Sequence, residues 1–351
     1  MTDRTSSSRC LVSAIIVNWN HRAFLPACLE ALRQDGSFDV VVIDNGSTDG
    51  SPEWLAEQHP DVRLIRFPYN QGFAPALNHG IRHTKHTFVL SLNPDVVIRP
   101  GFGQALINGL CEMGTTTGQR IGMAAPKMLR ADDPCLLDST GLLIDRRRRP
   151  YDRGQGERDR GQYDTQTDVF GACGAAALYR RDMLEDIATH SNAGKEFFDA
   201  GFFAYCEDAD LAWRAQLRGW HCAYVPSAVA THVRGCGDTL RKRGHARKND
   251  QGPRLALRNR YLMTFQNDTW RYVAADLPLM LAAELPRLAY AAFTAPRVLL
   301  APLDLLRACP SALRKRRYIR SRRTVDDAAL RHWFTAPRNP DATSAPLRAV
   351  P

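Results

Sequence analysis

The first hundred residues consist of short apolar runs separated by amphipathic segments. Val- and Ile-rich runs of this kind are typical of strands buried on both faces of a parallel sheet. They predict strands at 12–17, 40–43, 62–67 and 87–92. The segments between them carry apolar residues at helical spacing and predict helices at 24–34, 52–58 and 72–83. This alternation predicts an α/β fold with a mainly parallel sheet flanked by helices.

Polar residues follow three of these predicted strands. Asn18, Asp44 and Asp95 each stand just beyond a strand end. Ligands of open parallel sheets bind at the carboxyl ends of the strands. If the strands are neighbours, the three side chains line one polar crevice at that edge.

The pattern weakens between 131 and 168. The arginine run 146–149 and the charged, glycine-rich stretch 152–162 predict a mobile loop or an irregular insertion. The elements expected beyond it are a strand leading out of 170–179, a helix at 207–218, short strands at 223–225 and 229–232, and a basic loop at 235–252.

The last hundred residues change character. The segment 273–306 is rich in Leu and Ala, but its prolines and charges do not suit a membrane span. It suits either a helical pair packed on the rest of the protein or helices lying in a membrane interface. Seven of the ten residues in 314–323 are basic, which favours contact with an anionic leaflet. The expected division is a polar tail at 1–10, a main domain at 11–265, a helical, basic and membrane-associating extension at 266–325, and a disordered tail at 326–351.

Composition adds a basic bias to this picture. The net charge of +10 indicates an anionic partner, such as nucleic acid, phospholipid or a phosphorylated ligand, or else a solvated basic surface. The nine cysteines form no C-x-x-C pair, which disfavours a zinc ribbon and fits a reducing compartment. Residues 1–10 are polar and lack an apolar h-region, so no signal peptide is expected. We therefore expect a cytoplasmic protein at the inner face of the cell membrane.

Two polar motifs carry candidate ligand chemistry. Asp44, in the segment 44–50, could accept a hydrogen bond from a nucleobase or a ribose hydroxyl, although such a segment also suits a plain turn before a helix. Asp95, in Asn93-Pro94-Asp95, suits an oxygen-liganded Mg²⁺ or Mn²⁺, although one carboxylate alone is a poor metal site.

A third motif places several acids at the start of a helix. Glu207, Asp208 and Asp210 could simply favour the helix dipole. One of them could instead act as a general base toward an acceptor hydroxyl. Asp210 shares a helix face with Arg214, which leaves Asp208 freer for catalysis, so Asp208 is preferred and Asp210 stays open. His232, just past a strand, is a further candidate for a metal or diphosphate role.

Taken together, these motifs resemble those of family 2 glycosyltransferases of the inverting GT-A type, and among them bacterial rhamnosyltransferases of cell-surface polysaccharide synthesis. The resemblance spans about 12–260. It rests on the ordered segments 16–20, 44–50, 70–74, 93–95, 170–172 and 207–211.

The resemblance implies roles for individual residues. The donor nucleotide would contact Asn18, Asp44, Asn45, Asn70, Gly72, Phe73, Asn93 and Asp95. Asp95 matches the last residue of the family's D-x-D element and would bind Mg²⁺ or Mn²⁺ with His232, while Asn93 replaces the first Asp. Asp208 matches the catalytic base. Residues expected to contact or support the acceptor are Glu207, Asp210, Trp213, Arg214 and Arg258, the last within an R-N-R-Y stretch.

The implied reaction moves a sugar from a nucleotide-sugar donor, preferably dTDP-rhamnose, to a hydroxyl of a glycan or polyprenyl-linked acceptor. A UDP-sugar donor stays open. A basic nucleic-acid-binding protein is the alternative of another class, but no helix-turn-helix, RRM-like or zinc motif supports it, so no nucleic-acid partner is expected. Neither G-x-G-x-x-G nor G-x-x-x-x-G-K-[ST] is present, which disfavours a dinucleotide-dependent oxidoreductase or a P-loop enzyme.

Overall fold

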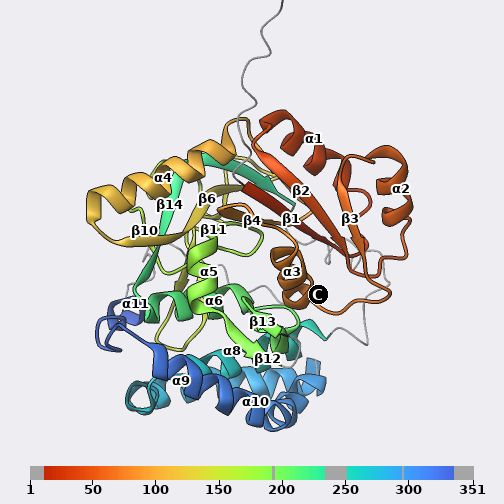
Figure 1. Ribbon diagram of the computed structural model, residues 1–351. Helices are drawn as coiled ribbons and strands as arrows, with labels where there is room; N and C mark the ends of the chain where they lie inside the picture. Colours follow the sequence, from red (N-terminus) through yellow and green to blue (C-terminus); the bar gives the residue numbers. More distant parts are fainter. Residues whose placement is uncertain (1–11, 192–193, 234–250, 295, 336–351) are drawn as a thin grey trace, which may run out of the picture.

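The computed structural model describes residues 12–191, 194–233, 251–294 and 296–335 (Figure 1). The expected N-terminal tail, almost all of the basic loop at 235–252, and 336–351 lie outside the described residues.

The N-terminal half forms the parallel part of a mixed sheet. Its strands are β1 (Val12–Asn18), β2 (Phe38–Asp44), β3 (Arg63–Arg66) and β4 (Phe88–Leu92), in the spatial order β4-β1-β2-β3. The helices between them are α1 (Leu25–Asp35), α2 (Ser51–Gln58) and α3 (Phe73–Arg82). The predicted alternation is therefore confirmed. Because β1 pairs with β2 so that Asn18 lies opposite Asp44, both residues reach the same edge.

The other half extends the sheet with strands of mixed direction. After β5 (Val96–Ile98) and α4 (Phe102–Thr117), β6 (Arg120–Arg130) enters the sheet. The strand β11 (Ala176–Arg180) runs antiparallel between β4 and β6, and β14 (Trp220–His232) runs parallel to β6. The segments 223–225 and 229–232, expected as separate strands, belong to this one strand, which is interrupted by a bulge between Val225 and Val229.

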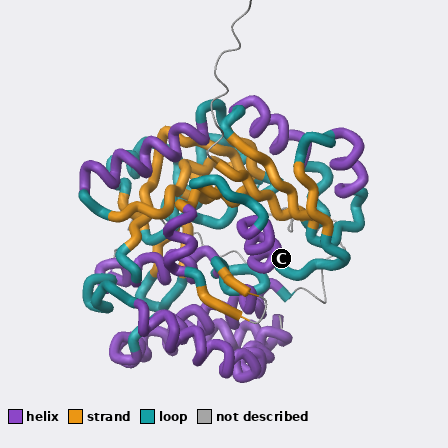
Figure 2. Tube along the Cα trace, viewed as in Figure 1, coloured by secondary structure: helices purple, strands orange, loops and turns teal. Residues whose placement is uncertain are grey.

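Helices cover both faces of the sheet (Figure 2). Successive side chains of a strand point to opposite faces. Accordingly Ile15 and Val17 join a core with α3, α5 (Arg181–Ile187) and α6 (Glu207–Leu217), whereas Ala14 and Ile16 join a second core with α1, α2 and α4. Continuous burial of β1 explains why its sequence is mostly apolar.

The segment expected to be a mobile or irregular loop is largely built into the fold. It contains β7 (Leu137–Ser139), β8 (Leu142–Ile144), β9 (Pro150–Asp152) and β10 (Asp168–Val169). β8 and β9 form a hairpin whose connection is the arginine run 146–149. Arg148 is fully buried there. For the arginine run, the expectation of a mobile loop was wrong, because its charges meet buried carboxylates of a distant helix. The described stretch 153–167 contains no helix or strand, which agrees with an irregular insertion.

The C-terminal residues form a helical layer below the α6 side of the sheet (Figure 1). Between α6 and this layer lie β12 (Thr189–Ser191), β13 (Gly194–Glu196) and the short helix η1 (Ala200–Phe202). The layer contains α8 (Gly252–Asn267), α9 (Trp270–Thr294), η2 (Pro296–Leu300), α10 (Ala301–Arg322) and α11 (Arg331–Thr335). Prolines 278 and 286 lie inside α9 without ending it. Among the described residues, no helix has the length and hydropathy that a membrane span requires.

The tail expected to be disordered from 326 begins as ordered structure. Leu330, Trp333 and Phe334 are buried. The rings of Trp333 and Phe334 lie 5.9 Å from Phe170 and 5.2 Å from Trp213, respectively, between centroids. Large aromatic side chains bury enough surface to order a short segment.

Candidate functional site

The ends of β1 and β2 form a bonded polar pair. The amide Nδ2 of Asn18 donates to Asp44 Oδ1 at 2.9 Å and to Ser47 Oγ at 3.1 Å. Asp44 Oδ2 in turn accepts from the Ser47 backbone N–H at 3.1 Å. Both Asn18 and Asp44 are buried, and the amide oxygen of Asn18 has no hydrogen-bond partner in the described structure. An unpartnered buried acceptor is costly, so it marks a place where a ligand donor would be stabilised.

A pocket of about 420 Å³ opens beside this pair. Its lining residues are Asp44, Gly46, Ser47, Thr48, Pro52, Arg66, Phe67 and Pro68. Pockets that bind small ligands have volumes of this order. Position 46 in the pocket lining requires glycine. A Cβ there would lie 2.5 Å from Tyr69 Cα, and the backbone φ of +75° also favours glycine.

Hydrogen bonds of the Asn45 side chain hold residues 70–72, which follow β3, at the same edge of the sheet. Asn45 Nδ2 donates to Asn70 Oδ1 at 2.9 Å and to the Gly72 carbonyl at 3.1 Å, and Asn45 Oδ1 accepts from the Gln71 N–H at 2.9 Å. Phe73 then begins α3. Asn18, Asp44, Asn45, Asn70 and Gly72, which the sequence assigned to the donor, are thus linked at one edge of the sheet.

Asp95 and His232 come together although they are far apart in the chain. The first strand after Asp95, β5, pairs antiparallel with the end of β14, so that His232 lies opposite Val96. His232 Nε2 lies 3.5 Å from Asp95 Oδ1. The other ring nitrogen, Nδ1, lies 2.8 Å from Oδ2 of the fully buried Asp138 on β7.

The surroundings of His232 favour its charged form in this state. Burial alone lowers the pKa of His232, but its interactions with Asp138 and Asp95 outweigh burial and raise the pKa to about 9. A carboxylate that holds one imidazole nitrogen fixes the ring orientation and makes the other nitrogen a better metal ligand. Asp138 was not among the candidates, since nothing in its local sequence distinguishes it.

The donor atoms of Asp95 and His232 fit a divalent cation. A carboxylate oxygen and the nitrogen of a neutral imidazole are ligands that Mn²⁺ accepts, and Mg²⁺ accepts the carboxylate, so His232 would give up its Nε2 proton to bind a cation. In the described part of the chain, no group of three or more His, Cys, Asp or Glu side chains is arranged to hold a metal. Phosphate oxygens and water would therefore have to complete the coordination.

Asp208 is held at the start of α6 by backbone donors. Its Oδ2 accepts from the Gly174 N–H at 2.9 Å, and its Oδ1 accepts from the Ala209 N–H at 2.8 Å. Burial raises the pKa of Asp208, while these two N–H groups act against the rise. Gly174 also receives a contact from Ser91 of β4, whose hydroxyl donates to the Gly174 carbonyl at 3.4 Å. Asp208 is thus tied to the strand that leads to Asn93 and Asp95.

The neighbouring acids of α6 have other surroundings. Asp210 is fully buried and pairs with Arg214 at 2.8 Å and with Asn267 at 2.7 Å. Arg214 also donates to the Ile187 and Phe197 carbonyls. Trp213 is buried among Phe170 and Phe334. Asp210, Trp213 and Arg214 therefore support the helix from inside and do not present their side chains to an acceptor.

Glu207 differs from both other acids. It is buried, and its Oε2 has no hydrogen-bond partner among the described residues. Burial and the charge of Asp208 raise the pKa of Glu207 to about 8. Glu207 is therefore expected to be largely protonated near neutral pH.

The loop before α6 is strained and aromatic. Phe203, Tyr205 and Cys206 all have positive φ, which non-glycine residues rarely adopt. The Asn259 side chain holds this loop by donating to the carbonyls of Phe202, Ala204 and Tyr205 at 2.7–2.8 Å. Such strain was not predictable from the sequence, because the bonds that sustain it come from α8.

The two arginines of the R-N-R-Y stretch make contacts within the protein. Arg258 donates to the Gly201 and Phe202 carbonyls, and Arg260 pairs with Glu284 at 2.6 Å. Arg258 therefore supports the strained loop in this conformation, where the sequence suggested an acceptor contact.

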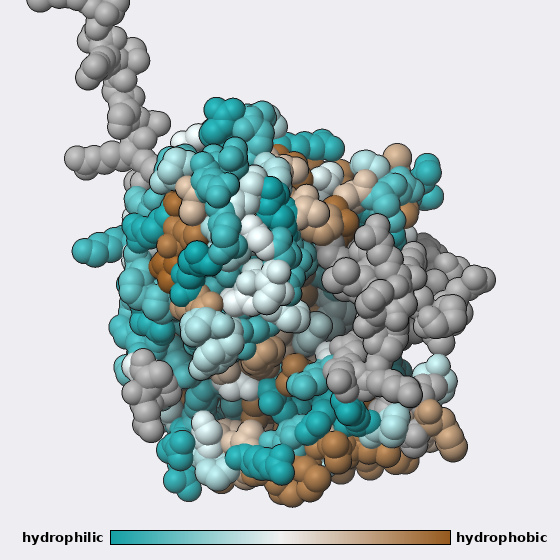
Figure 3. All heavy atoms as spheres, turned by 90° about the vertical axis from the view of Figure 1, so that its right-hand side faces the viewer, coloured by the Kyte–Doolittle hydropathy of each residue, from teal (hydrophilic) through white to brown (hydrophobic). Residues whose placement is uncertain are grey.

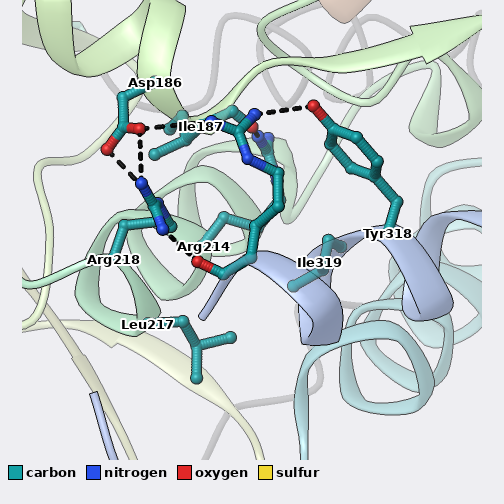
Figure 4. Close-up of a pocket in the computed structure, with 8 residues that line it drawn as sticks. Asp186, Ile187, Arg214, Leu217, Arg218, Tyr318 and Ile319 are labelled. Atoms are coloured by element: carbon teal, nitrogen blue, oxygen red, sulfur yellow. Dashed lines mark hydrogen bonds and ion pairs between the residues drawn. The ribbon is translucent and has the colours of Figure 1, made fainter. Parts of the chain in front are cut away.

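A second small pocket lies away from these residues, between α6 and α10 (Figure 4). Its volume is about 20 Å³, and Arg218 and Arg322 both reach Asp186 within it. It is too small for a substrate and its charges are paired, so it belongs to the packing of the C-terminal layer.

Comparison with known proteins gives this geometry a family context. The model of glycosyl transferase family 2 matches residues 13–188. The N-acetylglucosaminyl-diphospho-decaprenol L-rhamnosyltransferase of Mycobacterium tuberculosis is 26% identical over 226 residues, which cover 58% of this chain and 68% of the relative. The pre-mycofactocin glycosyltransferase of that species is 24% identical over 222 residues, covering 63% and 42%.

Solved structures agree in fold. GalNAc-T7, solved with UDP, GalNAc and Mn²⁺, has a TM-score of 0.52 at 13% identity, covering 73% of this chain and 48% of its own. Residues 1–349 of S. aureus TarS have a TM-score of 0.51 at 14% identity, covering 89% and 87%.

Proposed function

Because the chain belongs to glycosyl transferase family 2 and is a nucleotide-sugar-dependent glycosyltransferase, we propose that it transfers L-rhamnose from dTDP-rhamnose, with inversion, to a polyprenyl-linked glycan. The observation that carries the catalytic part is Asp208, a carboxylate fixed by two backbone N–H groups and tied through Gly174 to the strand before Asp95. Of the three acids at the start of α6, Asp208 alone combines partial exposure with a fixed orientation.

The donor would bind across the β1–β2 edge. Asp44 and the unpartnered oxygen of Asn18 are placed to accept hydrogen bonds from the nucleoside. The Asn45–Asn70–Gly72 network would hold the backbone that lines the sugar side of the pocket. These contacts would orient the donor in the pocket.

Asp95 and His232 would hold Mg²⁺ or Mn²⁺ together with the donor diphosphate. Such a cation supplies positive charge that stabilises the leaving diphosphate. The proposal is supported by the closeness of the two side chains and by the Mn²⁺ in the GalNAc-T7 structure. Because Asn93 stands in place of an acid, Asp95 is the one carboxylate proposed to bind the cation directly.

In the proposed reaction, Asp208 accepts the proton of the acceptor hydroxyl. The acceptor oxygen then forms a bond to the anomeric carbon from the face opposite the nucleotide. The bond between that carbon and the diphosphate oxygen breaks, and its electron pair leaves with the nucleoside diphosphate. A single displacement of this kind inverts the anomeric configuration.

The choice of sugar and acceptor rests on the mycobacterial relative, whose name specifies L-rhamnose and a diphospho-decaprenol acceptor. A lipid-linked acceptor would place the enzyme at the cytoplasmic face of a membrane. A UDP-sugar is the alternative donor. It would use the same contacts to the diphosphate, which dTDP and UDP share.

The test is nucleotide release by the purified protein with Mn²⁺ or Mg²⁺ and dTDP-rhamnose, UDP-glucose, UDP-galactose or UDP-N-acetylglucosamine. We expect turnover with dTDP-rhamnose and a loss of about 10²–10⁴-fold in Asp208→Asn, the usual contribution of general base catalysis. Asp95→Ala should also lose activity, whereas the exposed-site control Asp61→Asn should match the wild type. Turnover with a UDP-sugar alone would show that the donor is that UDP-sugar and not dTDP-rhamnose. Full activity of Asp208→Asn, or a retained anomeric configuration, would refute the mechanism.

A further inference from the structure

The C-terminal helices carry most of the exposed large apolar side chains. Twelve of the sixteen such residues in the described chain lie between Trp270 and Leu313. They are Trp270, Leu277, Leu279, Leu281, Leu285, Tyr290, Phe293, Leu299, Leu300, Leu303, Leu306 and Leu313. We call this surface of α9, η2 and α10 the C-terminal apolar face. Figure 3 shows apolar side chains gathered along this lower end of the molecule.

The polarity of α9 is inverted relative to an ordinary surface helix. Its acids Asp276 and Glu284 point inward and are buried. Asp276 meets Arg146, Arg148 and Arg331, each at 2.6 Å. Glu284 meets Arg149 and Arg260 at 2.5 and 2.6 Å. A soluble helix normally buries its apolar stripe and exposes its charges. Here the charges are satisfied inside, and leucines face outward.

The charges that remain on this surface have one sign. No Asp or Glu within the described residues of 270–323 is exposed. Besides the buried Asp276 and Glu284, the segment has one further acid, Asp304, which is partly buried and pairs with Arg254 at 2.6 Å. The exposed basic residues of the same segment are Arg271, Arg287, Arg297, Arg307, Arg314, Arg317 and Arg323. An apolar surface accompanied by arginines and free of exposed acids is complementary to a bilayer with anionic headgroups.

We propose that the C-terminal apolar face lies in the headgroup region of an anionic phospholipid bilayer. The leucines and Phe293, which is 89% exposed, would enter the acyl boundary while the arginines contact lipid phosphates. Large exposed apolar patches are uncommon on isolated soluble proteins and mark interaction sites. The inference deepens the proposed function, because a lipid-linked acceptor would then reach the site from the membrane that the enzyme occupies. The docking itself does not depend on the identity of the sugar.

The test is co-sedimentation of the full chain with unilamellar vesicles of phosphatidylcholine alone or mixed with phosphatidylglycerol. We expect preferential binding to the anionic vesicles, weakened by added salt. The double variant Leu285→Glu, Phe293→Glu should lose at least about tenfold in binding, because two exposed apolar groups that would enter the bilayer become charges. The control Thr116→Glu, on α4 at the other end of the molecule, should bind like the wild type.

Three outcomes would overturn the proposal. They are no binding of the wild type to anionic vesicles, equal loss in the control, and wild-type self-association that the double variant abolishes, which would make this face a contact between two copies. Donor hydrolysis measured on the same samples separates this proposal from the catalytic one. Normal hydrolysis without vesicle binding would refute only the docking, and vesicle binding without hydrolysis of any donor would count only against the enzyme mechanism.

Discussion

At the scale of the residue, three acids within four positions have three different environments. Glu207 is buried with an unpartnered oxygen, Asp208 is held by two backbone N–H groups, and Asp210 is neutralised by Arg214. The sequence placed all three at a helix start and predicted the Asp210–Arg214 pair from its spacing. It left the choice between Asp208 and Asp210 open, because burial depends on Asn267 and on the C-terminal layer.

Glu207 predicts a pH-dependent loss of stability. Its pKa of about 8 lies above the ordinary 4.5, so the folded protein binds more protons than the unfolded chain between those values. Stability therefore falls as pH rises through this window. The difference in unfolding free energy between Glu207→Gln and the wild type should increase in favour of the variant by about 1–3 kcal/mol from about pH 5 to pH 9, measured by urea unfolding. The exposed Glu112→Gln should show no such gain; a parallel gain there, or none in Glu207→Gln, would contradict the assignment.

Asp138 predicts a metal effect separate from catalysis. If Asp95 and His232 hold the cation, Asp138→Asn should weaken Mn²⁺ binding about 10–100-fold by removing the carboxylate that orients His232. The measurement is calorimetric titration with Mn²⁺ in the presence of nucleoside diphosphate. Ser139→Ala changes an equally buried neighbour and should leave Mn²⁺ binding intact. Unchanged Mn²⁺ affinity in a folded Asp138→Asn protein would exclude this positioning role.

At the scale of the element, the arginine run 146–149 shows how a local pattern can mislead. Clustered charges with glycines nearby indicate a solvated loop when only neighbours are considered. In the structure the run joins two strands and faces α9 and the end of α8. Arg148 meets Asp276 of α9 and Asp268, which follows α8, each at 2.6 Å. Ion pairs between residues more than a hundred positions apart leave no periodic signal in the sequence.

The Arg148 contacts predict a large stability effect. Arg148→Met should destabilise the protein by about 3 kcal/mol, because Asp268 loses its cation while still buried and Asp276 keeps fewer partners. Chemical denaturation gives the free energy of unfolding directly. The matched control is Arg147→Met, since Arg147 makes no ion pair within the described structure, and it should change stability by less than about 0.5 kcal/mol. Equal effects in the two variants would show that the buried ion pairs of Arg148 are not what stabilises this connection.

At the scale of the whole molecule, the C-terminal layer and the sheet enclose the helix that carries Asp208. Trp213 of α6 packs against Phe170 on one side and Phe334 on the other. Asn267 and Asn259 reach from α8 to Asp210 and to the strained loop. The family match ends at 188, so the candidate base and the C-terminal layer lie beyond the matched segment. The layer therefore contributes to the shape of the site and, through its outer face, to the proposed contact with a bilayer.

The sequence by itself determined the parallel half of the sheet and the residues at its edge. Strand periodicity, helix spacing and turn residues are local, and they placed Asn18, Asp44 and Asp95 just beyond strand ends before any contact was known. Only the tertiary structure decided which acid of α6 is held by backbone N–H groups, that Asp138 contacts the far side of the His232 ring, and that α9 turns its acids inward and its leucines outward. Each of these depends on pairing between distant segments, where the free energy of burying a charge is settled by a partner that the local sequence does not contain.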